Sequence, residues 1–117
     1  MITKLLIMPE YGCYPVWLID DREGIIDTRL PEELRSDLAL DAKFESLYER
    51  FNALYINNQH EFSYAGFRTK EEAIAFIRDW KLAVAELREK THGRYEIVDD
   101  LENADPDRDE WLSVPPV

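Results

Sequence analysis

The sequence contains one cysteine and four glycines among 117 residues, and no long hydrophobic run. Because Cys13 is alone, no internal disulfide can form, and a reducing compartment is expected. No apolar stretch approaches the roughly 20 residues that a membrane span needs. The apolar run before Pro9 is also shorter than the roughly 7 to 15 residues of a signal-peptide core. We therefore expect a soluble, cytoplasmic protein.

Basic residues are also scarce, with 14 lysines and arginines against 25 aspartates and glutamates and a formal net charge of -11. This balance disfavours a nucleic-acid partner, because phosphate binding needs clustered Lys and Arg. It disfavours anionic membrane surfaces, which attract polybasic segments, for the same reason. A cationic protein partner fits best, since opposite fields raise the association rate.

Motifs for catalysis and metal binding are missing. The sequence has no CxxC, HExxH or G-x-S-x-G pattern and no glycine-rich phosphate loop. Neither His60 nor His92 lies in a motif that would pair it with Cys13 as a nucleophile. The residues from Asp105 onward begin like a calcium loop, but the glycine that such a loop requires at position six is replaced by Glu110. We predict a protein that is not an enzyme and that has no metal site and no cofactor.

Hydrophobic periodicity predicts an α+β domain. Apolar and β-branched runs predict strands over residues 2–8 and 13–19, a short third strand over 25–28 and a last strand over 94–99. Apolar residues at helical spacing from Leu40 to Tyr55 predict a long helix that ends near residues 57–58. A capping box at Thr69–Glu72 and the His92-Gly93 pair bound a second long helix.

The expected element order is β-β-(β)-α-α-β, with a short helical turn after Pro31 and a connector over residues 59–68. Because each long helix has one apolar stripe, both should pack on one face of an antiparallel sheet of three to four strands. The last strand should lie beside the first, in a direction that the sequence leaves open. Residues 1–99 form the predicted domain, and residues 100–117 form an acidic tail that contains Trp111.

Aromatic and acidic residues in loops are the candidates for partner binding, because Tyr and Trp bury a large area with few torsions. The first set combines acids of a predicted hairpin loop with tyrosines expected nearby, and the second set lies in the tail. Packing against the domain is the alternative role of the tyrosines and of the tail tryptophan. The candidate residues are Tyr11, Tyr14, Asp20, Asp21 and Glu23 in the first set, and Asp107, Asp109, Glu110 and Trp111 in the second.

Two segments carry a family resemblance: the run YGCYPVWLI over residues 11–19, and LPEEL over residues 30–34, with Gly24 between them. In these segments the chain resembles small bacterial immunity proteins of polymorphic or contact-dependent toxin systems. The resemblance implies that the acidic domain binds a basic toxin domain, for which a nuclease is one candidate, and blocks its active site or its access to substrate.

Three other functions are compatible with the sequence. An acidic adaptor or regulatory module would share the charge and the lack of motifs. A small enzyme would use Cys13 or scattered carboxylates. An acidic mimic of nucleic acid would also bind a basic protein. The sequence does not specify the toxin, the oligomeric state or the stoichiometry.

Overall fold

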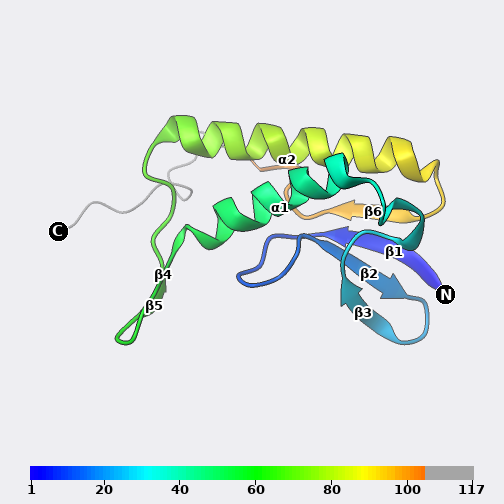
Figure 1. Cartoon of the computed structure of the whole chain (residues 1–117), viewed down its shortest axis with the longest axis horizontal. Helices are drawn as coiled ribbons and strands as arrows, with labels where there is room; N and C mark the ends of the chain where they lie inside the picture. Colours follow the sequence, from blue (N-terminus) through cyan, green and yellow to red (C-terminus); the bar gives the residue numbers. More distant parts are fainter. Residues whose placement is uncertain (105–117) are drawn as a thin grey trace.

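Three N-terminal strands form a meander, and a strand from the far end of the domain joins it. The computed structural model describes residues 1–104 (Figure 1). Strands β1 (Ile2–Ile7), β2 (Val16–Asp20) and β3 (Gly24–Thr28) pair antiparallel, and β6 (Glu96–Asp99) pairs with β1 in parallel. The resulting order is β3-β2-β1-β6. The last strand therefore lies beside the first, as expected, and its parallel direction makes the sheet mixed.

Two long helices cover one face of this sheet, as the apolar stripes predict (Figure 1). A 3-10 turn, η1 (Glu32–Leu34), leads into α1 (Leu38–Asn52), whose N-cap Asp37 accepts the backbone N–H of Leu40. Helix α2 (Lys70–Thr91) begins at the predicted cap, where the Thr69 hydroxyl accepts the Glu72 N–H at 3.2 Å. It ends at His92, which adopts the left-handed conformation.

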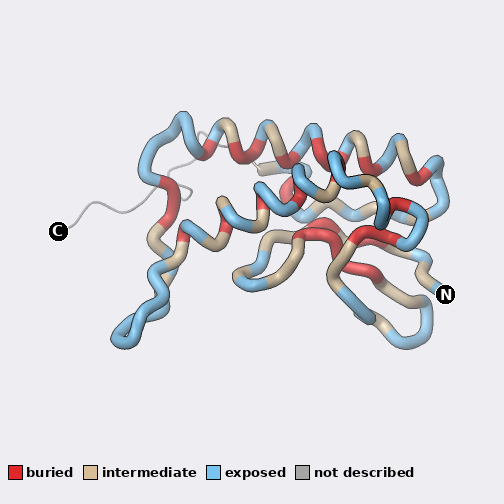
Figure 2. The backbone as a smooth tube through the Cα atoms, in the orientation of Figure 1, coloured by how far each residue is buried: buried red, intermediate tan, exposed pale blue. Residues whose placement is uncertain are grey.

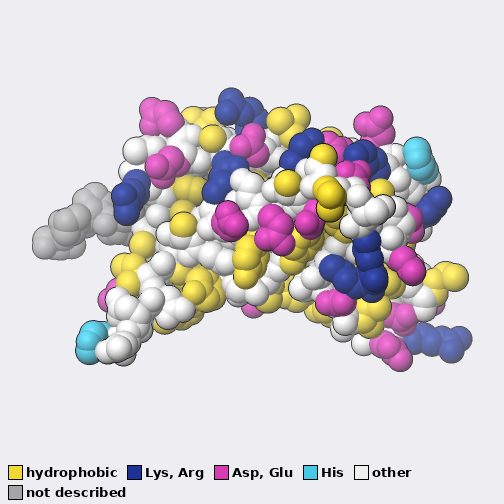
Figure 3. Space-filling view, in the orientation of Figure 1, with side chains coloured by type: hydrophobic (Ala, Val, Ile, Leu, Met, Phe, Trp, Pro, Cys, Tyr) yellow, Lys and Arg dark blue, Asp and Glu magenta, His cyan; other side chains and the backbone are white. Residues whose placement is uncertain are grey.

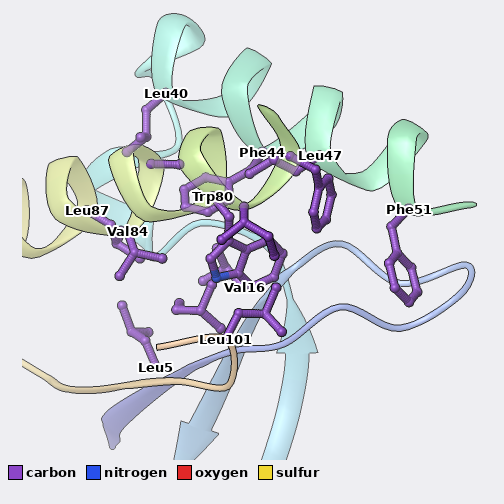
Figure 4. Packing of buried hydrophobic residues seen from close by; sticks show 14 of the residues in the cluster. Leu5, Val16, Leu40, Phe44, Leu47, Phe51, Trp80, Val84, Leu87 and Leu101 are labelled. Atoms are coloured by element: carbon purple, nitrogen blue, oxygen red, sulfur yellow. The ribbon is translucent and has the colours of Figure 1, made fainter. Parts of the chain in front are cut away.

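The hydrophobic core lies between the helices and the sheet (Figures 2 and 4). Trp80 of α2 is fully buried at its centre, with Leu5 of β1 and Phe44 of α1 also buried in the same cluster. The Trp80 indole N–H donates to the Asp99 carboxylate at 2.8 Å, so the buried ring leaves no unpaired donor. Leu101 also belongs to this cluster, which carries the core past the end of β6.

The structure corrects the predicted end of the first helix. Helix α1 ends at Asn52, and residues expected to continue it or to form a connector instead make a hairpin of β4 (Tyr55–Asn57) and β5 (Phe62–Tyr64). The carbonyl of Leu54 accepts the N–H groups of Ala65 and Gly66, which closes the base of the hairpin. Leu54 is still buried, so the apolar spacing continues although the helix does not.

The second strand also starts later than predicted. Residues 13–15 lie before β2, because the backbone turns back at residues 10–13, where the Cys13 N–H donates to the Glu10 carbonyl at 3.0 Å. Pro15 lacks an N–H and sits immediately before the first paired residue, which is a position that proline tolerates.

Two leucines of α1 provide a matched test of the packing. Leu40 is fully buried, whereas Leu38 is 77% exposed two residues earlier. Leu40→Ala should lower the free energy of unfolding by about 2–5 kcal/mol, because it removes buried methyl groups and leaves a cavity. Leu38→Ala should change it by less than about 0.5 kcal/mol. Urea unfolding of both variants is the measurement, and equal losses would contradict this core.

Lysine side chains join the two helices. Lys90 of α2 bonds to Asp37, the N-cap of α1, and lies 3.1 Å from Glu86, which also pairs with Lys43 of α1. Glu86 and Lys90 are four residues apart on α2, and their pair faces α1. These hydrogen bonds from Lys90 and Lys43 hold the pKa values of Asp37 and Glu86 below their usual range.

Acid should therefore weaken this junction. A carboxyl group whose folded-state pKa is depressed contributes stability above its unfolded pKa of about 4, and the contribution is lost as the pH falls through the folded-state pKa. Asp37→Asn keeps a cap acceptor but cannot ionise. Its free energy of unfolding should consequently fall less than the parent's between about pH 7 and about pH 3. Urea titrations across this range test the prediction, and identical acid sensitivity in both proteins would refute it.

Candidate partner-binding surface

The β1–β2 loop brings Tyr11 onto the β4–β5 hairpin. Gly12 has φ 76°, which allows the tight turn, and its N–H donates to the Asn52 side chain at the end of α1 at 3.0 Å. The Tyr11 hydroxyl accepts a hydrogen bond from Asn57 of β4 at 2.7 Å. The loop and the hairpin are thus fastened together, although they are far apart in sequence.

Aromatic rings fill the contact between this loop and the hairpin. The Tyr11 ring lies 5.1 Å from that of Tyr55 and 4.9 Å from that of Phe62, between ring centroids. Tyr55 stacks on Phe62 at 5.5 Å and meets Tyr64 edge-on at 5.3 Å. The hairpin still leaves Phe62 58% exposed, and Tyr64 and Ile56 are exposed as well. A two-stranded hairpin gains little stability alone, so these aromatic contacts hold it in place.

Tyr14 lies on the other side of the same loop, against α1. Its hydroxyl donates to the Asp41 carboxylate at 2.9 Å, and its ring lies 6.1 Å from that of Phe44. Burial, followed by the bond to Asp41, raises the pKa of Tyr14 and keeps the phenol protonated. Tyr14 and Asp41 line an open hollow of about 480 Å³ between the loop, the end of β3 and α1, together with Tyr48 and Glu45.

In the described part of the chain, no cation pairs with the carboxylates on the exposed side of α1. Asp41, Glu45 and Glu49 follow one another at four-residue spacing, and none takes part in an ion pair within residues 1–104. Partial burial and the charges of the two neighbouring acids raise the pKa of Glu45. Arg29 borders the hollow but pairs with Asp27 at 2.8 Å. The local field is therefore negative.

These features form one face, which we call the aromatic–acidic surface. Figure 3 shows acidic side chains across the middle of this face, over α1, with hydrophobic side chains beneath them and on the projecting hairpin. The surface comprises Tyr11, Tyr14, Asp41, Glu45, Glu49, Ile56, Phe62 and Tyr64.

The structure separates the residues of the first predicted set. Tyr11 and Tyr14 lie before β2, whereas Asp20 ends it, so the acidic turn and the tyrosines stand at opposite ends of one strand. Asp20 is also engaged, since its carboxylate bonds to the N-terminal amine and accepts the N–H groups of Arg22 and Glu23. Asp21 and Glu23 are exposed in that turn. The expected proximity of the two groups was wrong.

The second predicted set, Asp107, Asp109, Glu110 and Trp111, lies outside the described residues. Of the residues considered for catalysis, His60 lies at the tip of the β4–β5 hairpin and His92 at the end of α2. Within residues 1–104, no three His, Cys, Asp or Glu side chains gather as metal ligands would, and no helix is both long and apolar enough to cross a bilayer.

The α1 carboxylates and the hairpin aromatics were not among the partner-binding candidates that the sequence suggested. Asp41, Glu45 and Glu49 lie between the apolar positions of a predicted amphipathic helix, where solvated acids are common. The informative signal is the pairing pattern, since other acids such as Asp37, Asp79 and Glu86 have basic partners in the structure. For the hairpin, the run of polar residues between Ile56 and Phe62 was the available sign of a turn.

A domain that presents exposed aromatic rings on one face with carboxylates that have no described basic partner has the features of a protein-binding domain. The sequence profile of a family described as Serratia CdiI immunity protein-like matches residues 3–99. The chain belongs to this family, whose members are immunity proteins of contact-dependent inhibition toxin systems. A search of curated proteins found no match. Family membership confirms the predicted resemblance, implies a cognate toxin as the partner and favours binding over catalysis.

The contribution of Tyr11 to the stability of the β4–β5 hairpin is testable. Tyr11→Ala removes two ring contacts and the bond from Asn57, so amide hydrogen exchange across residues 55–64 should accelerate by about tenfold or more. Tyr11→Phe keeps the rings and should have a smaller effect. Mass-spectrometric exchange of both variants against the parent provides the comparison. Unchanged protection in Tyr11→Ala would show that the hairpin is held by other contacts.

Proposed function

We propose that this chain neutralises a basic cognate toxin domain by binding it through the aromatic–acidic surface and covering the toxin's active site or its path to substrate. The observation that carries the proposal is the position of exposed aromatic side chains on the same face as three carboxylates that have no ion-pair partner within residues 1–104. Family membership supplies the toxin as the partner class.

The charge pattern supports a basic partner. Carboxylates that repel one another raise the energy of the free protein, and a cation docked on them relieves that repulsion. The elevated pKa of Glu45 reports this repulsion together with partial burial. A toxin that acts on nucleic acid fits this chemistry, because binding a phosphate backbone requires clustered Lys and Arg. An acidic protein on that cluster would exclude the substrate.

The aromatic rings support a tight complex. Large aromatic side chains surrounded by contacts that exclude water carry much of the affinity of protein interfaces. Phe62 and Tyr64 lie on a hairpin that is held at its base and by Tyr11, so little ordering is needed on binding. The hairpin would provide the apolar contacts, and α1 would provide the electrostatic attraction and orientation.

Calorimetric titration of the purified cognate toxin domain tests the surface. Phe62→Ala and Glu45→Lys should each raise the Kd by about 30-fold, which corresponds to about 2 kcal/mol. The effect of Glu45→Lys should shrink as salt increases from about 50 to about 300 mM, because screening weakens exposed charge pairs. In a toxin activity assay, each of the two variants should inhibit the toxin less strongly than the parent protein does.

Matched controls separate the surface from general effects. Ile25→Ala removes an apolar side chain of β3 that is 56% exposed, against 58% for Phe62, and Glu89→Lys reverses an exposed charge on α2. Both should leave the Kd within about twofold. The double variant Asp21→Lys/Glu23→Lys examines the predicted hairpin-loop set. Loss of affinity there, with full affinity in Phe62→Ala and Glu45→Lys, would move the binding site to the β2–β3 turn.

A further inference from the structure

The hollow of about 480 Å³ between the β1–β2 loop, the end of β3 and α1 is lined by two kinds of group that attract cations. Asp41 and Glu45 provide carboxylates from successive turns of α1, and Tyr14 and Tyr48 provide aromatic rings. The Tyr14 hydroxyl donates to one oxygen of Asp41, and within residues 1–104 no group donates to the other. A cationic side chain in this hollow can therefore meet a carboxylate and an aromatic ring at once.

One cation of the chain itself lies at the rim of the hollow, and it is held there. Arg29, the first residue after β3, donates from Nε to the Asp27 carboxylate at 2.8 Å and from Nη1 to the Leu30 carbonyl at 3.2 Å. The Asp27 side chain also accepts the Thr28 N–H at 2.8 Å, which fixes its position. The bond from Arg29, followed by that from Thr28, lowers the pKa of Asp27.

This pairing determines where the charge of Arg29 lies. Arg29, Asp41 and Glu45 line the same hollow, yet Arg29 pairs with Asp27 and not with the carboxylates of α1. The Asp27 side chain is 52% exposed, and an exposed ion pair contributes little to folding stability. The main consequence of the pair is therefore the position of the guanidinium, at the rim rather than against α1.

We propose that the hollow receives one cationic side chain of the toxin, and that Asp27 is a positioning residue that keeps Arg29 from competing for the same carboxylates. The inference rests on the proposed function, since it names a contact within the aromatic–acidic surface. If Arg29 turned toward Asp41 and Glu45, it would neutralise them, and the toxin would have to displace it in order to bind. Asp27 prevents that competition without touching the toxin.

A cycle of variants measures the competition through the Kd of the purified cognate toxin domain, by calorimetric titration. Asp27→Asn keeps an oxygen for the Thr28 N–H but loses the charge that holds Arg29, so the Kd should rise about tenfold. Arg29→Gln removes the competing cation and should lower the Kd about threefold. In the double variant the Kd should match that of Arg29→Gln within about twofold, because Asp27 acts only through Arg29.

Glu96→Gln is the matched control. Glu96 belongs to β6, at the edge of the sheet opposite β3, and pairs with Lys4 at 3.8 Å. The variant makes the same change in net charge as Asp27→Asn and releases a different cation, so the Kd should stay within about twofold of the parent's. A similar loss of affinity in Glu96→Gln and Asp27→Asn would reduce the effect to net charge and overturn the role of Asp27.

Nuclear magnetic resonance of the free protein tests the position of Arg29 without the toxin. A cation that moves beside Glu45 lowers the pKa of its carboxyl group, so this pKa should be about half a unit lower in Asp27→Asn than in the double variant. The parent and Arg29→Gln should differ less, because Asp27 holds the guanidinium at the rim. Equal differences in the two pairs of proteins would show that Asp27 does not restrain Arg29 and would overturn the inference.

The toxin measurements separate this inference from the proposed function. Equal losses of affinity in Asp27→Asn and in the double variant would mean that Asp27 contacts the toxin itself, which would overturn its positioning role. Unchanged affinity in Asp27→Asn, with losses in Glu45→Lys and Phe62→Ala, would overturn the same role and leave the proposed surface intact. Full affinity in Glu45→Lys and Phe62→Ala would remove the proposed surface and the cationic contact together.

Discussion

The buried indole of Trp80 is the constraint on which the domain's arrangement depends. A tryptophan at zero exposure needs a partner for its N–H, and Asp99 at the end of β6 provides it. The same carboxylate accepts the N–H of Leu101, which turns the chain back under α2. One side chain thus joins α2 to the strand that closes the sheet beside β1. The parallel direction of β6 follows because the chain must return along α2 before it enters the sheet.

Local patterns predicted most of the fold, and long-range contacts account for what they missed. Caps and periodicity placed α2 and the third strand within a few residues, because side chains near in sequence determine those features. Leu54 and Tyr55 kept the helical spacing but lie beyond α1. Their burial comes from the core and from Tyr11, more than forty residues away, which a local period cannot reveal.

The candidate surface was harder to predict for the same reason. Tyr11 was expected in the loop, whereas Tyr14 fell within the predicted second strand. Each tyrosine serves the domain as well as the surface, through Asn57 and Asp41 respectively. Whether an acid is paired depends on which cations the fold brings to it. Asp37 and Asp41 look alike in sequence, yet Lys90 reaches only the first. The distinction between a stabilising carboxylate and an unpaired one emerges only in three dimensions.

This distinction explains how an acidic domain remains folded while keeping a strong negative face. Lys43, Lys90 and Arg50 form ion pairs with acids at the α1–α2 junction. Asp41, Glu45 and Glu49 lie on the opposite side of α1, where no described cation reaches them. Their repulsion is small because solvent screens exposed charges, so the fold tolerates it. When a partner excludes that solvent, the electrostatic interaction of these carboxylates with the partner's cations becomes stronger. A basic partner is therefore attracted most strongly to this face of α1.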